Sequence, residues 1–98
     1  MVRSLSMVFA LLAAPETAVA QAFEDKLELC MSCHGEKGIS SVQGVPSIAG
    51  RTPNQIVHQL RLFRSGQREH QQMVMAKRLT DQEIEQLAAY FSAKSLPR

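Results

Sequence analysis

The pentapeptide Cys30-Met31-Ser32-Cys33-His34 constrains this chain more than any other feature of its sequence. Two cysteines separated by two residues and followed directly by a histidine form the CxxCH spacing of c-type haem attachment. The thiols add across the haem vinyl groups as thioethers, and the two-residue spacer lets one helical turn present both to one porphyrin edge. The adjacent imidazole then reaches the iron as its proximal ligand. The motif therefore predicts one covalently attached haem c, held by Cys30 and Cys33, with His34 on its iron.

Other interpretations of the motif explain less of the sequence. A zinc site needs further cysteines or histidines at ligand spacing. The chain has no third cysteine, and its other histidines, His58 and His70, lie far apart. A thioredoxin-like redox pair would normally occur within a βαβ pattern, which this chain lacks. A chance match is the remaining alternative.

The N-terminus has the pattern of a secretory signal peptide. Arg3 supplies a weak positive region, residues 5–14 form an apolar region, and Ala-Val-Ala at 18–20 gives an A-x-A cleavage site. The apolar run is about half of the ~20 residues that a membrane-spanning helix needs. Pro15 would break a buried helix of the mature domain at this point. We therefore expect residues 1–20 to be a signal peptide that is removed.

Residues 21–98 are expected to form one small domain exported to the periplasm, with no transmembrane anchor after cleavage. A chain this short buries little surface in a hydrophobic core of its own. A covalent haem would supply a large apolar body around which it could pack. Both cysteines belong to the motif, so none is left to form a disulfide. The haem-free protein should therefore be mostly unfolded.

The distribution of charge says more than the formal net charge of +2. Acidic residues cluster around the CxxCH motif: Glu24, Asp25, Glu28 and Glu36. Four arginines lie in a stretch that contains no acidic residue: Arg51, Arg61, Arg64 and Arg68. A solvated helix face or a docking patch for an acidic partner would explain the arginines. Nucleic-acid binding is disfavoured, because an exported chain that is barely basic and lacks interleaved aromatic residues does not fit it.

Two of the expected helices have clear sequence signals for where they begin or end. Thr52 can cap the second helix of the chain, and Gly66 suits its C-terminal stop. The third helix begins with a capping box formed by Thr80 and Glu83. Apolar residues recur at helical spacing within both segments.

A shorter first helix is expected over residues 22–33, and no convincing strand occurs between the helices. A loop rich in glycine and proline follows at 35–50, and a polar loop is expected at 67–79. Loops this long in a small domain usually have a function. The sequence therefore predicts an all-α fold of about three helices wrapped around one haem.

Further segments follow the CxxCH motif in a fixed order: VPSIAG at 45–50, QL at 59–60 with Phe63 and SG at 65–66, LTDQEI at 79–84 and LAAYF at 87–91. Together with CMSCHG at 30–35, this set resembles class I cytochromes c, in particular the bacterial cytochrome c4 and c553-like group. The chain also looks similar to the haem subunit of flavocytochrome c sulfide dehydrogenases. The resemblance covers essentially the whole of residues 21–98 and implies the small class I cytochrome c-like fold.

The resemblance implies roles for residues outside the motif. Pro46 matches a family proline whose carbonyl accepts a hydrogen bond from the proximal histidine, so Pro46 would orient His34. A plain loop proline is the alternative. The family's distal ligand is a methionine just before the last helix, where a thioether favours ferrous iron. Met73 is the nearer match and Met75 the alternative, while His70 or an open site remains.

The chain departs from the family pattern at two positions near the expected haem. Relatives often have an aromatic residue where this chain has Gln55, and many have glutamine where it has Arg51. These departures concern the surroundings of the haem and leave the attachment motif untouched.

The sequence therefore predicts a periplasmic monohaem cytochrome c that carries single electrons between redox partners, with His/Met axial ligation. No residue is needed as acid, base or nucleophile, so an electron carrier is expected rather than an enzyme. The alternative is the electron-accepting cytochrome subunit of a dehydrogenase complex, such as flavocytochrome c sulfide dehydrogenase. Expected partners are a flavoprotein or other dehydrogenase and a terminal oxidase or reductase. A haem sensor or catalyst with an open distal site is a third possibility.

Overall fold

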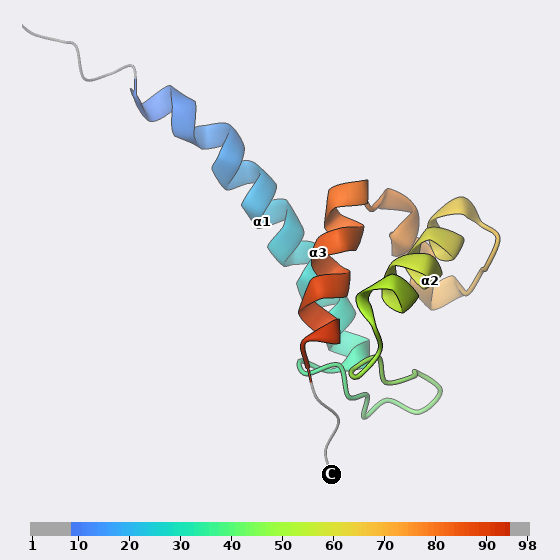
Figure 1. Cartoon of the computed structure of the whole chain (residues 1–98). Coiled ribbons are helices and arrows are strands. Elements are labelled where there is room, and N and C mark those ends of the chain that lie inside the picture. The colour runs from blue at the N-terminus through green and yellow to red at the C-terminus, as the bar shows by residue number, and fades with distance from the viewer. Residues whose placement is uncertain (1–8, 95–98) are drawn as a thin grey trace, which may run out of the picture.

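The computed structural model describes residues 9–94, with side chains described from residue 17 onward. Within these residues the regular structure is entirely helical, and no strand occurs. Figure 1 shows the elements in order: α1 (Phe9–His34), α2 (Pro53–Ser65), the 3₁₀ helix η2 (Gln71–Arg78) and α3 (Asp81–Ser92). The all-α prediction is confirmed.

The predicted caps of α2 and α3 are present. Thr52 Oγ1 accepts a hydrogen bond from the Gln55 amide (3.1 Å), and Gln55 Oε1 accepts one from the Thr52 amide (2.9 Å). The same reciprocal pair forms at the start of α3 between Thr80 and Glu83. Gly66 ends α2 in the left-handed conformation with φ 83°. These contacts satisfy backbone groups that a helix terminus leaves without intrahelical partners.

Helix α1 begins at Phe9, well before the expected start at residue 22, so that boundary was predicted wrongly. The segment is rich in alanine and leucine, which have high helix propensity. Their preference outweighs the one backbone hydrogen bond that Pro15 cannot donate. Figure 1 shows the N-terminal part of α1 extending away from the other helices, and residues 17–22 are exposed. Residues 1–8 of the expected signal peptide lie outside the described residues.

No helix between residues 9 and 94 is both long and apolar enough to cross a membrane.

The segment before α3 is a 3₁₀ helix instead of the polar loop that the sequence suggested. His70 caps it, because the His70 Nδ1 atom accepts a hydrogen bond from the Gln72 amide (3.2 Å). A 3₁₀ helix repeats every three residues, which places Met73, Ala76 and Leu79 in one row. Ala76 is fully buried and Leu79 is 4% exposed. The loop prediction missed this row because a threefold apolar period matches neither an α-helix nor a strand.

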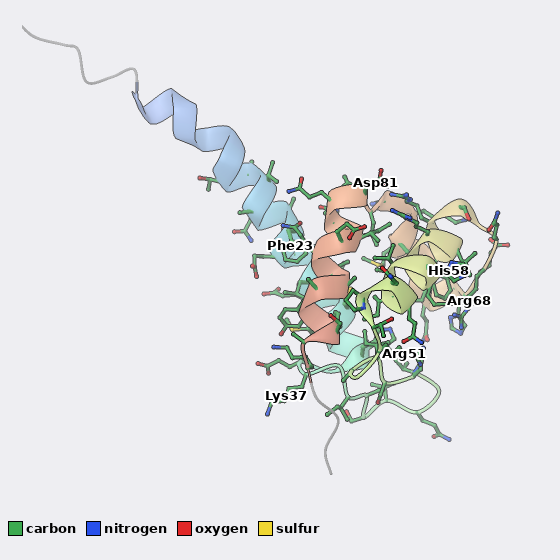
Figure 2. The ribbon with its side chains drawn as sticks, viewed as in Figure 1. Phe23, Lys37, Arg51, His58, Arg68 and Asp81 are labelled. Carbon is green, nitrogen blue, oxygen red and sulfur yellow. The ribbon has the colours of Figure 1, made fainter. Side chains whose placement is uncertain are left out.

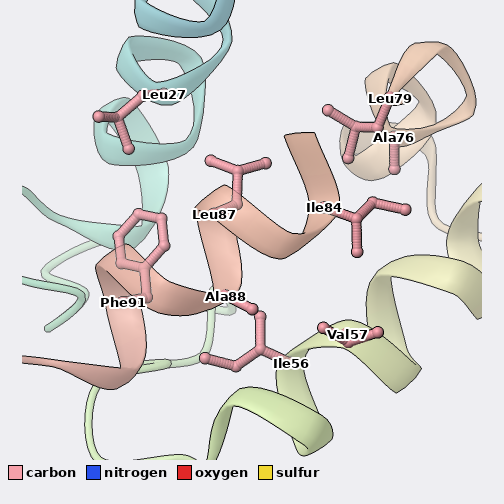
Figure 3. Packing of buried hydrophobic residues seen from close by; sticks show 9 residues of the cluster. All are labelled: Leu27, Ile56, Val57, Ala76, Leu79, Ile84, Leu87, Ala88 and Phe91. Carbon is pink, nitrogen blue, oxygen red and sulfur yellow. The ribbon is translucent and has the colours of Figure 1, made fainter. Parts of the chain in front are cut away.

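The hydrophobic core is centred on α3, which contacts the other elements through one continuous cluster (Figure 3). Its buried members come from all four helices: Leu27 of α1; Ile56 and Val57 of α2; Ala76 of η2 and Leu79 after it; and Ile84, Leu87, Ala88 and Phe91 of α3.

An ion pair between Lys26 and Glu83 adds a polar link between α1 and α3. The Lys26 Nζ atom lies 2.7 and 2.9 Å from the two carboxylate oxygens of Glu83. It also donates to the Arg78 carbonyl at 3.3 Å. Burial raises the pKa of Glu83, but hydrogen bonds from Lys26 and from the Thr80 amide outweigh that effect and lower this pKa overall. Glu83 therefore serves both as helix cap and as the partner of a half-buried ammonium.

Two of the four arginines in the basic stretch pair with α3. The Arg64 guanidinium lies 2.7 Å from the Asp81 carboxylate, and Arg61 lies 3.7 Å from Glu85. The hydrogen bond and charge of Arg64 lower the pKa of Asp81. For Arg61 and Arg64, the solvated helix face is therefore the better interpretation.

Candidate functional site

A cleft open to solvent lies between the C-terminal end of α1, the loop that follows it, α2 and η2. Its empty volume is about 1460 Å³, including the part that opens to solvent. Apolar side chains line much of it: Ile48, Ile56, Leu60, Phe63, Leu87 and Phe91. All six residues that the sequence proposed for the site also line it: Cys30, Cys33, His34, Pro46, Met73 and Met75. An apolar, one-sided cleft of this kind fits a flat hydrophobic cofactor.

Cys30 and Cys33 belong to the last turns of α1 and are three residues apart, so both project from the same side of the helix. Both are half-buried free thiols. Burial raises the pKa of the Cys30 thiol to about 11. A redox or metal-binding cysteine requires the opposite shift, toward the thiolate. In addition, no group of three or more metal-ligating side chains occurs in the described part of the chain. The raised pKa of the Cys30 thiol does not fit the thiolate that the dithiol and zinc interpretations need.

The ring of His34 is held by the backbone of the following loop. Its Nδ1 atom lies 2.8 Å from the Pro46 carbonyl oxygen. A carbonyl oxygen can only accept, so Nδ1 must carry the proton and donate it. The Nε2 atom of the neutral ring then has a free lone pair that can bind a metal. This arrangement gives the ring a defined tautomer and orientation before any metal is considered.

Backbone contacts hold the Pro46 loop against the end of α1. Gly38 adopts φ 75°, and its carbonyl accepts hydrogen bonds from the Ile48 amide (2.8 Å) and from the next amide (3.0 Å). Gly35, directly after His34, adopts φ 91°, and a Cβ atom there would lie 2.2 Å from the Ile39 carbonyl oxygen. The chain can therefore turn back at this point only with glycine at position 35.

Serine side chains contribute to the same loop, and sequence reasoning missed them. The Ser40 amide donates to Ser47 Oγ (2.9 Å), and the Ser40 hydroxyl lies 3.2 Å from the Cys33 carbonyl oxygen, to which it can donate. No local pattern marks these serines, because their partners are set by how the loop folds. The contacts connect the attachment motif to the segment that carries Pro46.

Met31, inside the CxxCH spacer, faces away from the cleft. Its sulfur accepts a contact from the Tyr90 hydroxyl at 3.6 Å, and the same hydroxyl lies 3.1 Å from the Glu36 carbonyl oxygen. Tyr90 thus packs α3 against the end of α1, and Met31 is unavailable as an iron ligand. The candidate methionines are those of η2.

Met73 and Met75 are both half-buried and both reach the cleft. Met73 shares the buried face of η2 with Ala76, whereas Met75 lies on another face of that helix. His70 also lines the cleft, but one of its ring nitrogens already accepts the hydrogen bond that caps η2.

Several known proteins are similar in sequence to this chain. The family profile described as cytochrome c matches residues 17–93. The chain is 42% identical over 83 residues to cytochrome c4 of Thiocapsa roseopersicina, which covers 84% of this chain and 43% of that protein. It is 32% identical over 79 residues to cytochrome c-554(548) of Halomonas halodenitrificans, covering 76% of this chain and 95% of that protein.

Cytochrome c4 of Pseudomonas aeruginosa is 31% identical over 85 residues, covering 86% of this chain and 41% of that protein. The chain thus spans less than half the length of the c4 relatives it matches. Its sequence is consistent with the c4 group of class I c-type cytochromes. With a family profile across most of its length and a CxxCH motif at the cleft, the chain belongs to the cytochrome c family, and its cofactor is covalently bound haem c.

Proposed function

We propose that this chain is a periplasmic monohaem cytochrome c that carries single electrons between redox proteins, with His34 and Met73 as axial iron ligands. Cys30 and Cys33 form the two thioethers, and Pro46 orients the proximal histidine. The observation that carries the proposal is the bond from His34 Nδ1 to the Pro46 carbonyl, beside two thiols that line the same cleft. It leaves Nε2 free where a covalently attached haem would need it.

The side chains around the cleft suit electron transfer better than catalysis. When bound, the haem supplies the one-electron chemistry of its iron. The apolar part of the lining suits a hydrophobic cofactor, and the tethered loop holds His34 in one orientation. A methionine as second axial ligand fills the remaining position, so no substrate needs to bind the iron. Nothing in this arrangement requires a general acid, base or nucleophile.

Met73 is preferred to Met75 because of the geometry of η2. The Cα atom of Met73 lies in the same row as Ala76 and Leu79, which are both buried against the core. A ligand on this row is supported by packed neighbours on the same face. Val74, the residue between the two methionines, is 57% exposed, which shows that η2 has an outward face close by.

The ligand assignment can be tested by absorption spectroscopy of the purified holoprotein. Family members owe a weak long-wavelength band of the ferric protein to methionine–iron coordination. Met73→Ala should lose this band, and Met75→Ala should keep it with at most a small shift. Loss in Met75→Ala alone would transfer the role to Met75. Ready binding of carbon monoxide to the reduced wild type would contradict a closed six-coordinate iron.

Export is part of the proposal. The Ala-Val-Ala sequence at 18–20 lies on the exposed part of α1, beyond the contacts of the core. N-terminal sequencing of protein from a periplasmic fraction should begin at Gln21. A haem-loaded protein that retains residues 1–20 would contradict cleavage at this position.

The redox partners are proposed to bind by small, weak contacts suited to fast exchange. Size-exclusion chromatography of native extract should then recover the cytochrome at the size of a small free protein. Stable co-elution with a much larger flavoprotein would instead identify it as a subunit of a dehydrogenase complex.

A further inference from the structure

The cleft carries one arginine whose charge has no acidic partner and no aromatic neighbour. Arg51 and Arg68 both line the cleft, and Figure 2 labels both. The Arg68 guanidinium lies 4.6 Å from the centre of the Phe63 ring and is hydrogen-bonded to the Gln59 side chain. The Arg51 guanidinium donates a hydrogen bond to the Ser47 carbonyl, at 3.4 Å. Within residues 17–94, no carboxylate pairs with Arg51.

An amide donor lies four residues further along the chain, in the first turn of α2. Gln55 also lines the cleft, and its Oε1 atom accepts the hydrogen bond from the Thr52 amide. Because a backbone N–H can only donate, this bond fixes which end of the side-chain amide faces the helix cap. The NH₂ group of Gln55 is left without a partner among the described residues. The N-terminus of the 13-residue helix α2 adds positive potential at the same place.

Haem c bears two propionate groups, which are carboxylates at neutral pH. We propose that Arg51 and Gln55 form a carboxylate-binding pair at the rim of the cleft and hold one haem propionate. A guanidinium and an amide NH₂ offer charge-assisted and neutral N–H donors to the same carboxylate. Both side chains line the same cleft, and both are donors suited to one anion.

The pair has a consequence for the iron. A positive charge held near the haem stabilises the ferrous state relative to the ferric state, because the ferric centre carries one more positive charge. Arg51 therefore raises the reduction potential of this cytochrome relative to a protein with neutral glutamine at that position. The inference rests on the haem assignment, and the identity of the distal methionine does not enter it.

The test uses redox titration of the purified holoprotein and its variants, followed by haem absorbance. Arg51→Gln should lower the ferrous-to-ferric ratio at a fixed potential about threefold to fivefold, a midpoint shift of roughly 30 to 40 mV at 59 mV per tenfold change. Arg51→Lys keeps the charge and should retain most of the wild-type value. The matched control is Arg61→Gln, which removes the same charge from a residue that does not line the cleft and pairs with Glu85.

Gln55→Glu tests the second member of the pair without removing the helix cap. Glutamate is also a capping-box residue, so the oxygen contact with Thr52 is kept while the NH₂ donor is replaced by a charge that repels a propionate. The ratio should fall as in Arg51→Gln, and the double variant should shift it by less than the sum of the two changes. Proton resonances of one propionate should move in both variants and stay in place in Arg61→Gln.

Equal shifts in Arg51→Gln and Arg61→Gln would overturn the inference, since they would reflect net charge alone. Unchanged propionate resonances in Arg51→Gln would also overturn it. Either result, obtained on protein with a normal haem spectrum, leaves the electron-carrier proposal intact. Absence of covalent haem from the wild type would instead refute the proposed function.

Discussion

Glu83 joins the cap of α3 to the ion pair with Lys26, so Glu83→Gln isolates the charge from the cap. The glutamine oxygen can still accept from the Thr80 amide, as in a capping box with Gln. The same Oε1 atom lies 2.7 Å from Lys26 Nζ, so the ammonium keeps this oxygen and the Arg78 carbonyl at 3.3 Å as neutral acceptors. It loses the negative charge of the carboxylate, and an NH₂ group replaces the oxygen that now lies 2.9 Å from Nζ.

The size of the effect follows from how far the pair is shielded from water. Fully buried pairs cost about 3–5 kcal/mol when one partner is removed, whereas exposed pairs contribute about 0–1 kcal/mol. The Lys26 and Glu83 side chains are 26% and 11% exposed, so solvent screens part of the interaction. We expect Glu83→Gln to lower the free energy of unfolding by about 1.5–2.5 kcal/mol at pH 7.

The matched control is Glu85→Gln on the same helix. Its pair with Arg61 is longer, at 3.7 Å, and the two side chains are 54% and 64% exposed. Its loss should cost less than about 0.5 kcal/mol. Urea unfolding of the holoproteins, followed by circular dichroism, measures both values, and urea avoids the screening that a salt denaturant would add.

The dependence on pH provides an independent check. The pKa of Glu83 is lowered in the folded protein from its ordinary value of 4.5. Its charge therefore stabilises the fold fully above that ordinary value, and the contribution is lost as the pH falls through the lowered folded pKa. The difference between wild type and Glu83→Gln should shrink as the medium becomes more acidic than pH 4.5. Equal destabilisation by Glu83→Gln and Glu85→Gln, or a difference that persists in acid, would refute the reasoning.

Three further changes test the core, the turn and the cofactor. Ile84→Ala removes a fully buried side chain and should cost about 2–5 kcal/mol in urea unfolding, against almost nothing for Val74→Ala at an exposed position. Gly35→Ala would place a methyl group 2.2 Å from a carbonyl oxygen and should lower the melting temperature well beyond Gly44→Ala, which has positive φ but nothing within 4 Å. The double variant Cys30→Ala/Cys33→Ala, expressed without haem, should lack native helical circular dichroism, and a native spectrum would contradict the role given to the cofactor.

Local signals made α2 and α3 predictable. Helix ends are marked by residues that form hydrogen bonds with neighbours a few positions away: Thr52, Gly66, Thr80 and Glu83. Those bonds are present in the structure. The grouping of the site residues could also be anticipated, because the order of motifs resembles one family.

Contacts between residues far apart in the sequence could not be predicted from such local signals. The contact between Lys26 and Glu83 joins residues 57 positions apart, and neither has a sequence context that identifies the other. The 3₁₀ helix was not predicted for a different reason. Its apolar residues Met73, Ala76 and Leu79 recur every three residues, a period that is typical of neither an α-helix nor a strand. Helix α1 begins as early as Phe9 because the helix propensity of its alanine and leucine residues outweighs the effect of Pro15.

The continuity of α1 bears on what maturation would do to this protein. The first turn of the uncut helix holds no acidic residue, so nothing there offsets the positive end of its dipole. Proteolysis after Ala20, as proposed, would make a new helix terminus close to Gln21. Glu24 and Asp25 would then fall in the opening turn, where carboxylates stabilise a helix. Removal of the leader would thus convert two surface acids into stabilising groups for the helix that ends in the haem attachment motif.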